Sequence, residues 1–209
     1  MTGTPPASPL LDCPLPPSDL HLRQIPVRIL DVASFPLLRI HRSAFSPLFY
    51  NRRSSSSTVY RFDAPADEYG VLYASPEFDV CMAETLVRDA FQTWPLVLDE
   101  SEIAERSIST LGIVGRTDLM LVDLTAPLFP LGGTSVISAC SDYFAPNRWS
   151  KGFFDHPKDY DGLYFLSRFS NLPSVALFDR VETTVDETIK LLADPRLPDF
   201  LDRYGIALV

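Results

Sequence analysis

The sequence predicts an α+β fold, in which many short strands and a few helices form one compact domain. Short apolar or alternating runs between turn residues recur along the chain, and this pattern indicates strands. Fewer segments carry apolar residues at three- and four-residue steps, as amphipathic helices do. The length of 209 residues is typical of a single domain, and 46% hydrophobic with 22% charged residues is typical of a globular protein.

The N-terminal residues 1–30 are expected to form an arm, and residues 31–209 a single domain. Prolines stand at positions 5, 6, 9, 14, 16 and 17 of the arm. Proline at this density excludes a regular helix or a central strand, so we predict that the arm is extended.

The first half of the domain is expected to contain three strands and one long helix. Alternating or β-branched runs predict the strands at residues 35–42, 59–62 and 70–74. Ser75 and Pro76 suit the cap and the first position of a helix, which is expected to run through residues 76–94. Glu84 lies beside the apolar stripe of this helix, so its carboxylate is expected at the edge of the buried face.

The second half of the domain is expected to contain further short elements. Strands are predicted at residues 119–124, 162–167, 174–178 and 205–209, and helices at 99–105, 147–156, 185–193 and 199–204. The strands at 162–167 and 174–178 are expected to form a hairpin, and residues 126–146 to form a loop.

The composition excludes several classes of protein. The net charge of −9 and the pI of about 4.7 argue against nucleic acid as a partner, because binding to phosphates needs clustered Lys and Arg. No apolar run approaches the ~20 residues of a membrane-spanning helix, and no signal peptide opens the chain. We therefore expect the protein to act in the cytoplasm and without a membrane partner. Delivery into a target cell by a leaderless secretion route is an open alternative.

Sequence motifs for cofactors and metals are absent. Neither of the phosphate-binding loops GxGxxG and GxxxxGK[ST] occurs, and neither HExxH nor GxSxG occurs. No histidine has a second histidine three or four residues away, and Cys13, Cys81 and Cys140 form no CxxC pair. We expect reduced thiols, no metal site and no cofactor.

Several segments, in order along residues 35–182, resemble the RES-domain family, which is named for an Arg, a Glu and a Ser. The most specific likeness is residues 70–75 followed by Ala83-Glu84. The other similar segments are residues 38–40, 60–62, 148–150, 160–168 and 175–178. Tyr60 departs from the family's pattern, which has Gly at that position. Each segment alone is a weak signal, and their order and spacing carry the resemblance.

This resemblance implies an ADP-ribosyltransferase-like fold and an enzyme that degrades NAD⁺ by hydrolysis or phosphorolysis. It also implies a toxin that a cognate antitoxin or immunity protein neutralises. NAD⁺ would be the substrate, with no separate cofactor. The family's motifs assign catalytic roles to Arg39, Glu84 and Ser167, and contacts with NAD⁺ to Arg39, Arg61, Tyr73, Ser150 and Ser167.

These residue types suit cleavage of the nicotinamide–ribose bond. A carboxylate such as that of Glu84 can stabilise the positive charge that develops on the ribose. Arginine presents forked N–H donors to a pyrophosphate, and Tyr73 can stack on an aromatic ring of the ligand. A serine hydroxyl can donate to the nicotinamide amide or to a ribose hydroxyl, and Ser150 competes with Ser167 for this role.

Two other interpretations remain open at this stage. If a macromolecule accepts the ADP-ribose, the same bond cleavage makes the protein an ADP-ribosyltransferase. If the fold only binds a nucleotide or a partner protein, the protein is a non-enzymatic module. Taken singly, each candidate residue is more often structural than catalytic, and only their order in the family's pattern favours the enzyme.

Overall fold

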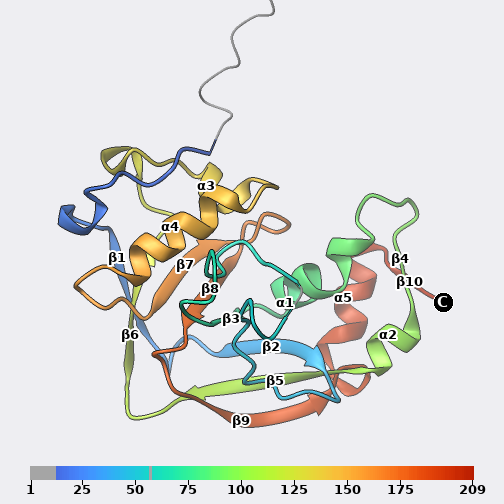
Figure 1. Ribbon diagram of the computed structural model, residues 1–209. Helices are drawn as coiled ribbons and strands as arrows, with labels where there is room; N and C mark the ends of the chain where they lie inside the picture. Colours follow the sequence, from blue (N-terminus) through green and yellow to red (C-terminus); the bar gives the residue numbers. More distant parts are fainter. Residues whose placement is uncertain (1–12, 57) are drawn as a thin grey trace, which may run out of the picture.

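The computed structural model describes residues 13–56 and 58–209 of the chain (Figure 1). Its strands are β1 (Val27–Asp31), β2 (Leu37–Arg42), β3 (Val71–Ala74), β4 (Val97–Leu98), β5 (Arg106–Ile113), β6 (Asp118–Asp123), β7 (Gly162–Leu166), β8 (Pro173–Phe178), β9 (Thr183–Lys190) and β10 (Ala207–Leu208). Its α-helices are α1 (Phe78–Thr85), α2 (Glu100–Ala104), α3 (Val136–Ala139), α4 (Phe144–Phe154) and α5 (Arg196–Tyr204). Single turns of 3₁₀-helix lie at Leu20–Leu22, Val87–Asp89, Phe129–Leu131 and Leu191–Ala193.

The strands form two main sheets and a small pair. The larger sheet has the order β1-β6-β7-β8-β3, the second has the order β2-β5-β9, and β4 pairs with β10. The pairs β6–β7 and β4–β10 are parallel, and the other strand pairs are antiparallel. Figure 1 shows the two main sheets at a steep angle to each other. The α+β fold class, with short and mostly antiparallel strands, is therefore confirmed.

Three apolar clusters hold these layers together. The first lies between the larger sheet and α4, and Trp149 and Phe153 of that helix are fully buried in it. The second packs α1 and α5 against the three-stranded sheet, and the third lies between the two sheets. Because α1 is fixed by the second cluster, its polar residues are held in a defined position beside the sheets.

The two sheets meet at the end of β3. Leu38 of β2 and Ser75 exchange backbone hydrogen bonds of 2.8 and 3.0 Å, so the strand that carries Arg39 lies directly beside the start of the α1 region. The Ser75 hydroxyl also donates to the carbonyl of Pro173 at 2.7 Å. Because Ser75 belongs to this junction, the helix begins at Phe78 with Glu77 as its cap, not at Pro76. It ends at Thr85, well short of the predicted residue 94.

Two predicted elements are wrong, and the strands β1, β4 and β5 were not predicted. Residues 59–62 form no strand, since they have no ladder partner and side chains bind their backbone. The predicted helix at 185–193 is instead strand β9 up to Lys190, because its pairing with β5, which is distant in sequence, decides its structure. Strand β5 escaped prediction because Ser and Thr separate its few apolar residues. Its register against β9 shifts at Thr110 and Leu111, where Asp186 of β9 has no partner on β5.

The C-terminal elements agree better with expectation. The hairpin of β7 and β8, the strand β6, the helix α5 and the final strand β10 are confirmed. Helix α4 starts at Phe144, before the predicted residue 147, and its first turn accommodates Pro146 because no backbone N–H is needed there. Helix α3 lies inside the predicted loop of residues 126–146.

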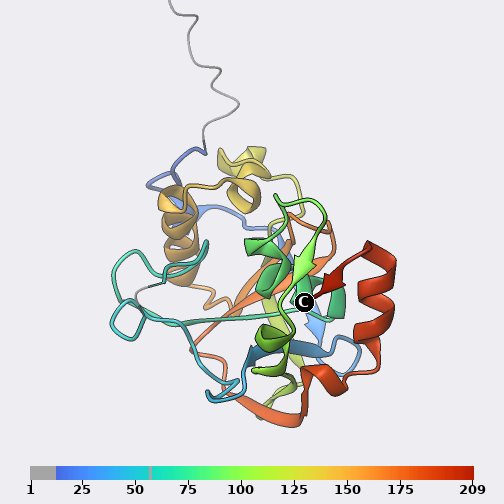
Figure 2. The same ribbon diagram turned by 90° about the vertical axis from the view of Figure 1, so that its right-hand side faces the viewer.

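The described part of the N-terminal arm packs on the domain. The carbonyl of Pro14 accepts a hydrogen bond from Trp149 Nε1 at 2.7 Å, and Leu20 is buried in the first cluster. Residues 27–30, at the end of the predicted arm, belong to β1, which pairs with β6. Both views show this segment against α3 and α4 (Figures 1 and 2). Three of the six prolines named above, at positions 5, 6 and 9, lie in residues 1–12, outside the described residues.

Within residues 13–56 and 58–209, no helix is long and apolar enough to cross a membrane.

Substitution of Gly162 by alanine is expected to destabilise the larger sheet by about 2–4 kcal/mol. An added Cβ would overlap the carbonyl oxygen of Ala176 and lie 2.9 Å from the Cα of Leu177, both on the neighbouring strand β8. Urea unfolding measures the loss. The control is Gly115→Ala, where φ is +67° and no atom lies within 4 Å of the added Cβ. It should lose only about 1 kcal/mol, and an equal loss at both positions would contradict the steric explanation.

Candidate active site

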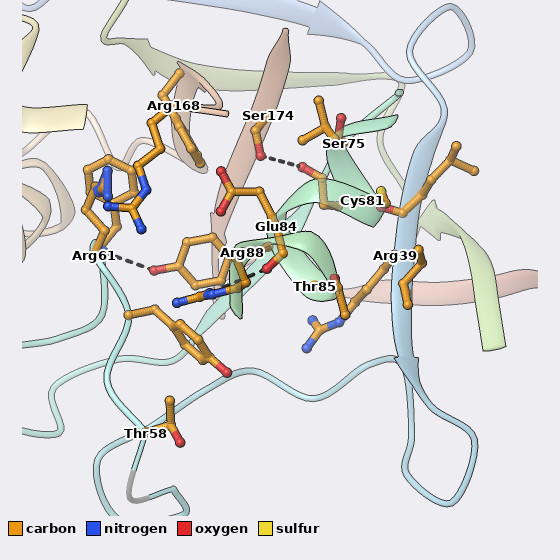
Figure 3. A pocket seen from close by; sticks show the side chains of 18 of the residues that line it. Arg39, Thr58, Arg61, Ser75, Cys81, Glu84, Thr85, Arg88, Arg168 and Ser174 are labelled. Atoms are coloured by element: carbon orange, nitrogen blue, oxygen red, sulfur yellow. Dashed lines mark hydrogen bonds between the residues drawn. The ribbon is translucent and has the colours of Figure 1, made fainter. Parts of the chain in front are cut away.

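A cavity of about 510 Å³ lies at the junction of the two sheets. Its walls come from β2, the end of β3, helix α1, the segment 58–62 and the hairpin of β7 and β8. Figure 3 shows Glu84 near the centre, Arg39 reaching in from β2, and Arg61 and Arg168 on the opposite side. The residues that line it are Leu38, Arg39, Ile40, Arg42, Thr58, Tyr60, Arg61, Phe62, Tyr73, Ala74, Ser75, Val80, Cys81, Glu84, Thr85, Arg88, Asp89, Arg106, Ser138, Tyr143, Phe165, Arg168 and Ser174.

Glu84 and Ser167 come together although 83 residues separate them. The Ser167 hydroxyl donates a hydrogen bond of 2.7 Å to Glu84 Oε1. Ser167 is fully buried where β7 ends, and its Oγ also accepts from the Phe169 N–H at 3.2 Å. Since this hydroxyl is fixed by two bonds, it holds one carboxylate oxygen of Glu84. The other oxygen is left to face the cavity.

Arg39 supplies a cation on the β2 side of the cavity. Successive side chains of a strand point to opposite faces, so Arg39 lies on the same face of β2 as Leu37. Leu38 and Ile40 lie on the opposite face, in the second cluster with α1. Burial lowers the pKa of Arg39 to about 10, which leaves the guanidinium charged at neutral pH. Its Nη1 is buried and has no hydrogen-bond partner among the described residues. A buried donor without a partner is costly, so this group is suited to bind an anionic ligand.

Arg61 supplies a second cation from the non-regular segment after residue 58. Its Nη1 donates to the carbonyl of Ser138, and its guanidinium lies 5.3 Å from the ring centroid of Tyr143. Its Nε is buried without a partner among the described residues. Burial lowers the pKa of Arg61, and the neighbouring Arg168 lowers it further.

Two tyrosines form the aromatic part of the wall. The rings of Tyr60 and Tyr73 pack edge to face with centroids 5.7 Å apart. The Tyr73 hydroxyl donates to Asp63 at 3.1 Å and accepts from the Phe62 N–H at 2.9 Å. Burial raises the pKa of Tyr73, and the Asp63 charge adds to this increase. Tyr73 therefore offers the cavity its ring rather than its hydroxyl.

Comparison with known proteins identifies the family. A model of the RES domain matches residues 36–198. The chain belongs to the RES domain family. Its fold is similar to that of a chain in the crystal structure of the M. tuberculosis MbcT–MbcA toxin–antitoxin complex, with a TM-score of 0.60 and 13% sequence identity. The match covers 81% of this chain and 88% of that chain. No curated protein sequence matched.

Of the residues predicted for the site, the RES fold brings five together and leaves one outside. Arg39, Arg61, Tyr73 and Glu84 line the cavity, and Ser167 is bonded to Glu84. Ser150 does not line it. The Ser150 hydroxyl is fully buried in α4, where it accepts from Tyr69 at 2.8 Å and donates to the Phe62 carbonyl at 2.6 Å. Its position does not support the predicted contact with a ligand, because both of its bonding directions are used within the protein.

Sequence reasoning missed further arginines of the RES cavity. Arg168 follows Ser167 at the turn of the β7–β8 hairpin, and Arg88 lies in the 3₁₀ turn Val87–Asp89 that follows the helix of Glu84. Arg42 and Arg106 are neutralised by salt bridges to Glu102, and Arg88 Nε lies 3.7 Å from Asp89. The only signal available for Arg88 was its spacing of four residues from Glu84 on the predicted helix of residues 76–94.

Three of the cavity arginines have no acidic partner. Arg39, Arg61 and Arg168 form no ion pair with any carboxylate in residues 13–56 and 58–209. They surround the single half-buried carboxylate of Glu84. The cavity is therefore locally basic in an acidic chain. Among the described residues there is also no group of three His, Cys, Asp or Glu side chains placed to hold a metal ion.

Proposed function

We propose that this RES domain is an enzyme that cleaves the nicotinamide–ribose bond of NAD⁺, as a glycohydrolase or a phosphorylase. One observation carries the proposal: the Glu84 carboxylate, held by Ser167, faces a cavity that also contains the unpaired arginines Arg39, Arg61 and Arg168. The cavity of about 510 Å³ falls in the range of sites for small-molecule ligands.

The distribution of charge fits the two ends of this substrate. The pyrophosphate is anionic and would lie against the unpaired guanidinium groups, which present N–H donors to phosphate oxygens. The ribose next to nicotinamide becomes positively charged as the bond breaks, and Glu84 would stabilise that charge. The rings of Tyr60 and Tyr73 provide rigid surfaces against which a nicotinamide or adenine ring can pack.

The leaving group explains why we propose no separate cofactor. Nicotinamide carries its positive charge in NAD⁺ and leaves as a neutral base, so its departure needs no added proton or Lewis acid. The electron pair of the broken bond stays on the nicotinamide nitrogen. A nucleophile then forms a new bond to the ribose carbon, and Glu84 can orient it or accept its proton.

Three acceptors would give three different products. Water yields ADP-ribose, phosphate yields ADP-ribose 1″-phosphate, and a macromolecule becomes ADP-ribosylated. The third outcome is the alternative function, an ADP-ribosyltransferase.

We propose further that the protein acts as a toxin, through depletion of NAD⁺ in the cytoplasm. Membership of the RES family and the fold shared with a chain of the toxin–antitoxin complex support this. An enzyme of this kind would harm the cell that makes it. We therefore propose a cognate antitoxin or immunity protein as its partner.

The product profile from NAD⁺ tests the proposal. Purified protein is incubated with NAD⁺, with and without phosphate, and free nicotinamide and the ribose products are separated and quantified. Release of nicotinamide by the wild type supports the proposed function, and the accompanying product identifies the acceptor. No release of nicotinamide, with or without candidate macromolecular acceptors, would refute it.

Replacement of Ser167 by alanine is expected to lower kcat/KM for NAD⁺ cleavage by about 10–100-fold. The change removes the 2.7 Å bond to Glu84, and a hydrogen bond to a charged group contributes about 1.5–3 kcal/mol. The matched control is Ser170→Ala in the same turn, because the Ser170 hydroxyl has no partner among the described residues. Equal activity in the two variants would show that Ser167 does not orient Glu84.

A further inference from the structure

The cavity wall at residues 60–62 is a segment without regular structure, and buried side chains bind its backbone. The Tyr60 N–H donates to Asp63 Oδ2 at 2.6 Å, and the Phe62 N–H donates to the Tyr73 hydroxyl at 2.9 Å. The Phe62 carbonyl accepts from Ser150 at 2.6 Å. Asn147 Nδ2 donates at 2.9 Å both to the Tyr60 carbonyl and to the Arg61 carbonyl. Side chains from β3, α4 and the following turn thus replace the ladder bonds that a strand would have supplied.

Asn147 is the residue that spans the segment. It is 3% exposed and lies in the first turn of α4, which the apolar cluster around Trp149 fixes to the larger sheet. Arg53 donates to Asn147 Oδ1 at 3.0 Å, which turns the amide so that Nδ2 faces the segment. Both ends of this one amide group are therefore occupied, and its orientation is fixed.

Asp63 is the second buried residue that holds the segment 60–62. It is 1% exposed, and Oδ2 accepts from Asn51 Nδ2 as well as from the Tyr60 N–H, both at 2.6 Å. Its Oδ1 accepts from Tyr73 at 3.1 Å. Burial raises the pKa of Asp63, so the charged form is held at a cost in stability that its three donors offset in part. An apolar residue here would avoid this cost, which indicates that the geometry of the segment is what the carboxylate maintains.

The side chains of this segment are those of the ligand cavity. Tyr60 and Arg61 both line it, and Arg88 lies over the Tyr60 ring at 5.6 Å. No regular ladder fixes the Arg61 backbone, so the buried bonds to Asn147 and Asp63 set where its side chain starts, while Ser138 and Tyr143 hold the guanidinium at the other end.

We propose that Asn147 and Asp63 are positioning residues for substrate binding, acting through Tyr60 and Arg61 and touching no substrate themselves. This inference rests on the proposed function, in which Arg61 binds the pyrophosphate of NAD⁺. Ser150, which donates to the Phe62 carbonyl, has the same role of holding this segment in place.

A double-mutant cycle between Asn147 and Arg61 tests this inference. Asn147→Ala should raise KM for NAD⁺ about tenfold and change kcat less than about twofold, because uniform binding is lost while the Glu84 site is untouched. Arg61→Ala should raise KM at least as much. In the double variant KM should rise by clearly less than the product of the two single effects, since Asn147 acts in part through that side chain. An unchanged KM in Asn147→Ala, or single effects that multiply in the double variant, would overturn the proposal.

Two further variants separate positioning from loss of folding. Tyr73→Phe keeps the cavity ring and removes only the bonds to Phe62 and Asp63, so it should show the same rise in KM even if Asn147→Ala does not fold. Asp161→Asn changes a buried carboxylate that bonds the Met120 N–H and does not line the cavity. It should lower the melting temperature and leave KM unchanged. If Asp161→Asn raises KM as much as Tyr73→Phe does, the rise in KM follows from lost stability and not from a lost positioning role.

A second readout keeps this test apart from that of the proposed function. The Kd of ADP-ribose, measured by calorimetry, can replace KM in the same cycle. Wild type that binds ADP-ribose without cleaving NAD⁺ would refute the proposed reaction and leave the positioning test intact. Absence of ADP-ribose binding by folded wild type would overturn the positioning role as well.

Discussion

Replacement of Glu84 by glutamine is expected to lower kcat for NAD⁺ cleavage by about 10³-fold, with a change in KM of less than about threefold. Glutamine has the same shape as glutamate and keeps an oxygen that can accept from the Ser167 hydroxyl. The substitution therefore removes the negative charge and little else. Because that charge is proposed to act on a ribose that becomes positive only as the bond breaks, its loss should affect the transition state and not the bound substrate.

The prediction needs a control for removal of any acidic residue from this helix. Glu77 stands at the N-cap position of the same helix α1, makes no capping bond with its side chain and does not line the cavity. Glu77→Gln should retain kcat within about twofold, since neutralising a carboxylate outside the cavity has little effect on charge inside it. If Glu84→Gln also retains its activity, the carboxylate does not stabilise the reacting ribose, and the chemistry must be assigned to another group.

The local charge of the cavity differs from that of the whole chain. With a net charge of −9, the protein as a whole repels an anion such as NAD⁺. The unpaired Arg39, Arg61 and Arg168 gather on one concave surface, where low-dielectric walls strengthen their field. A sequence total therefore cannot exclude a phosphate-bearing small molecule, although it argues well against an extended nucleic-acid surface.

The elements predicted from the sequence are mainly the strands whose apolar residues form a clear local pattern. Strands β2, β3, β6, β7 and β8 each have an apolar or alternating run, and each was predicted within a few residues. Strand β9 was predicted as a helix, and its pairing with β5, which no local pattern reveals, makes it a strand. Strand β5 was missed because its few apolar residues are divided between its two faces, with Ile108 in the second cluster and Leu111 in the third.

The candidate site could be predicted only in part, because distant segments build it. Glu84 and Ser167 were recognisable from the spacing of RES motifs, and the structure places them 2.7 Å apart. The segment 60–62 also resembles a family motif, but its backbone is fixed by Asn147 from α4, a contact that no local pattern reveals. Ser150 lies on α4 with Asn147. It was predicted to contact the ligand, but its hydroxyl bonds the Phe62 carbonyl of the cavity wall and does not face the interior of the cavity.

Replacement of Arg39 by methionine is expected to raise the free energy of unfolding by about 1–2 kcal/mol and to lower kcat/KM for NAD⁺ by about 100-fold or more. Burial lowers the pKa of Arg39 to about 10, and its Nη1 lacks a partner among the described residues. A folded-state pKa below the unfolded value means that the protonated form destabilises the fold at every pH where it is charged in both states. Methionine has a similar length and no charge, so this cost disappears.

Urea unfolding with an unchanged m-value measures the gain in stability, and NAD⁺ kinetics measure the loss of activity. Arg39→Lys is the matched control, because it keeps a cation and removes the forked donors. It should lose activity and gain no stability. A methionine variant less stable than wild type would show that Arg39 supports the fold and is not held for a ligand.

The two effects of Arg39→Met have one cause. A protein that only had to fold would place an apolar residue on β2 between Leu37 and the cavity, as it does with Leu38 and Ile40 on the other face. An unpaired guanidinium at that position lowers stability until an anion arrives to pair with it. Ligand binding should therefore stabilise wild type more than the methionine variant, and the difference in the melting-temperature shift with saturating ADP-ribose measures the contribution of Arg39. The cost in stability of the free protein and the gain on ligand binding both follow from Arg39 having the ligand as its partner.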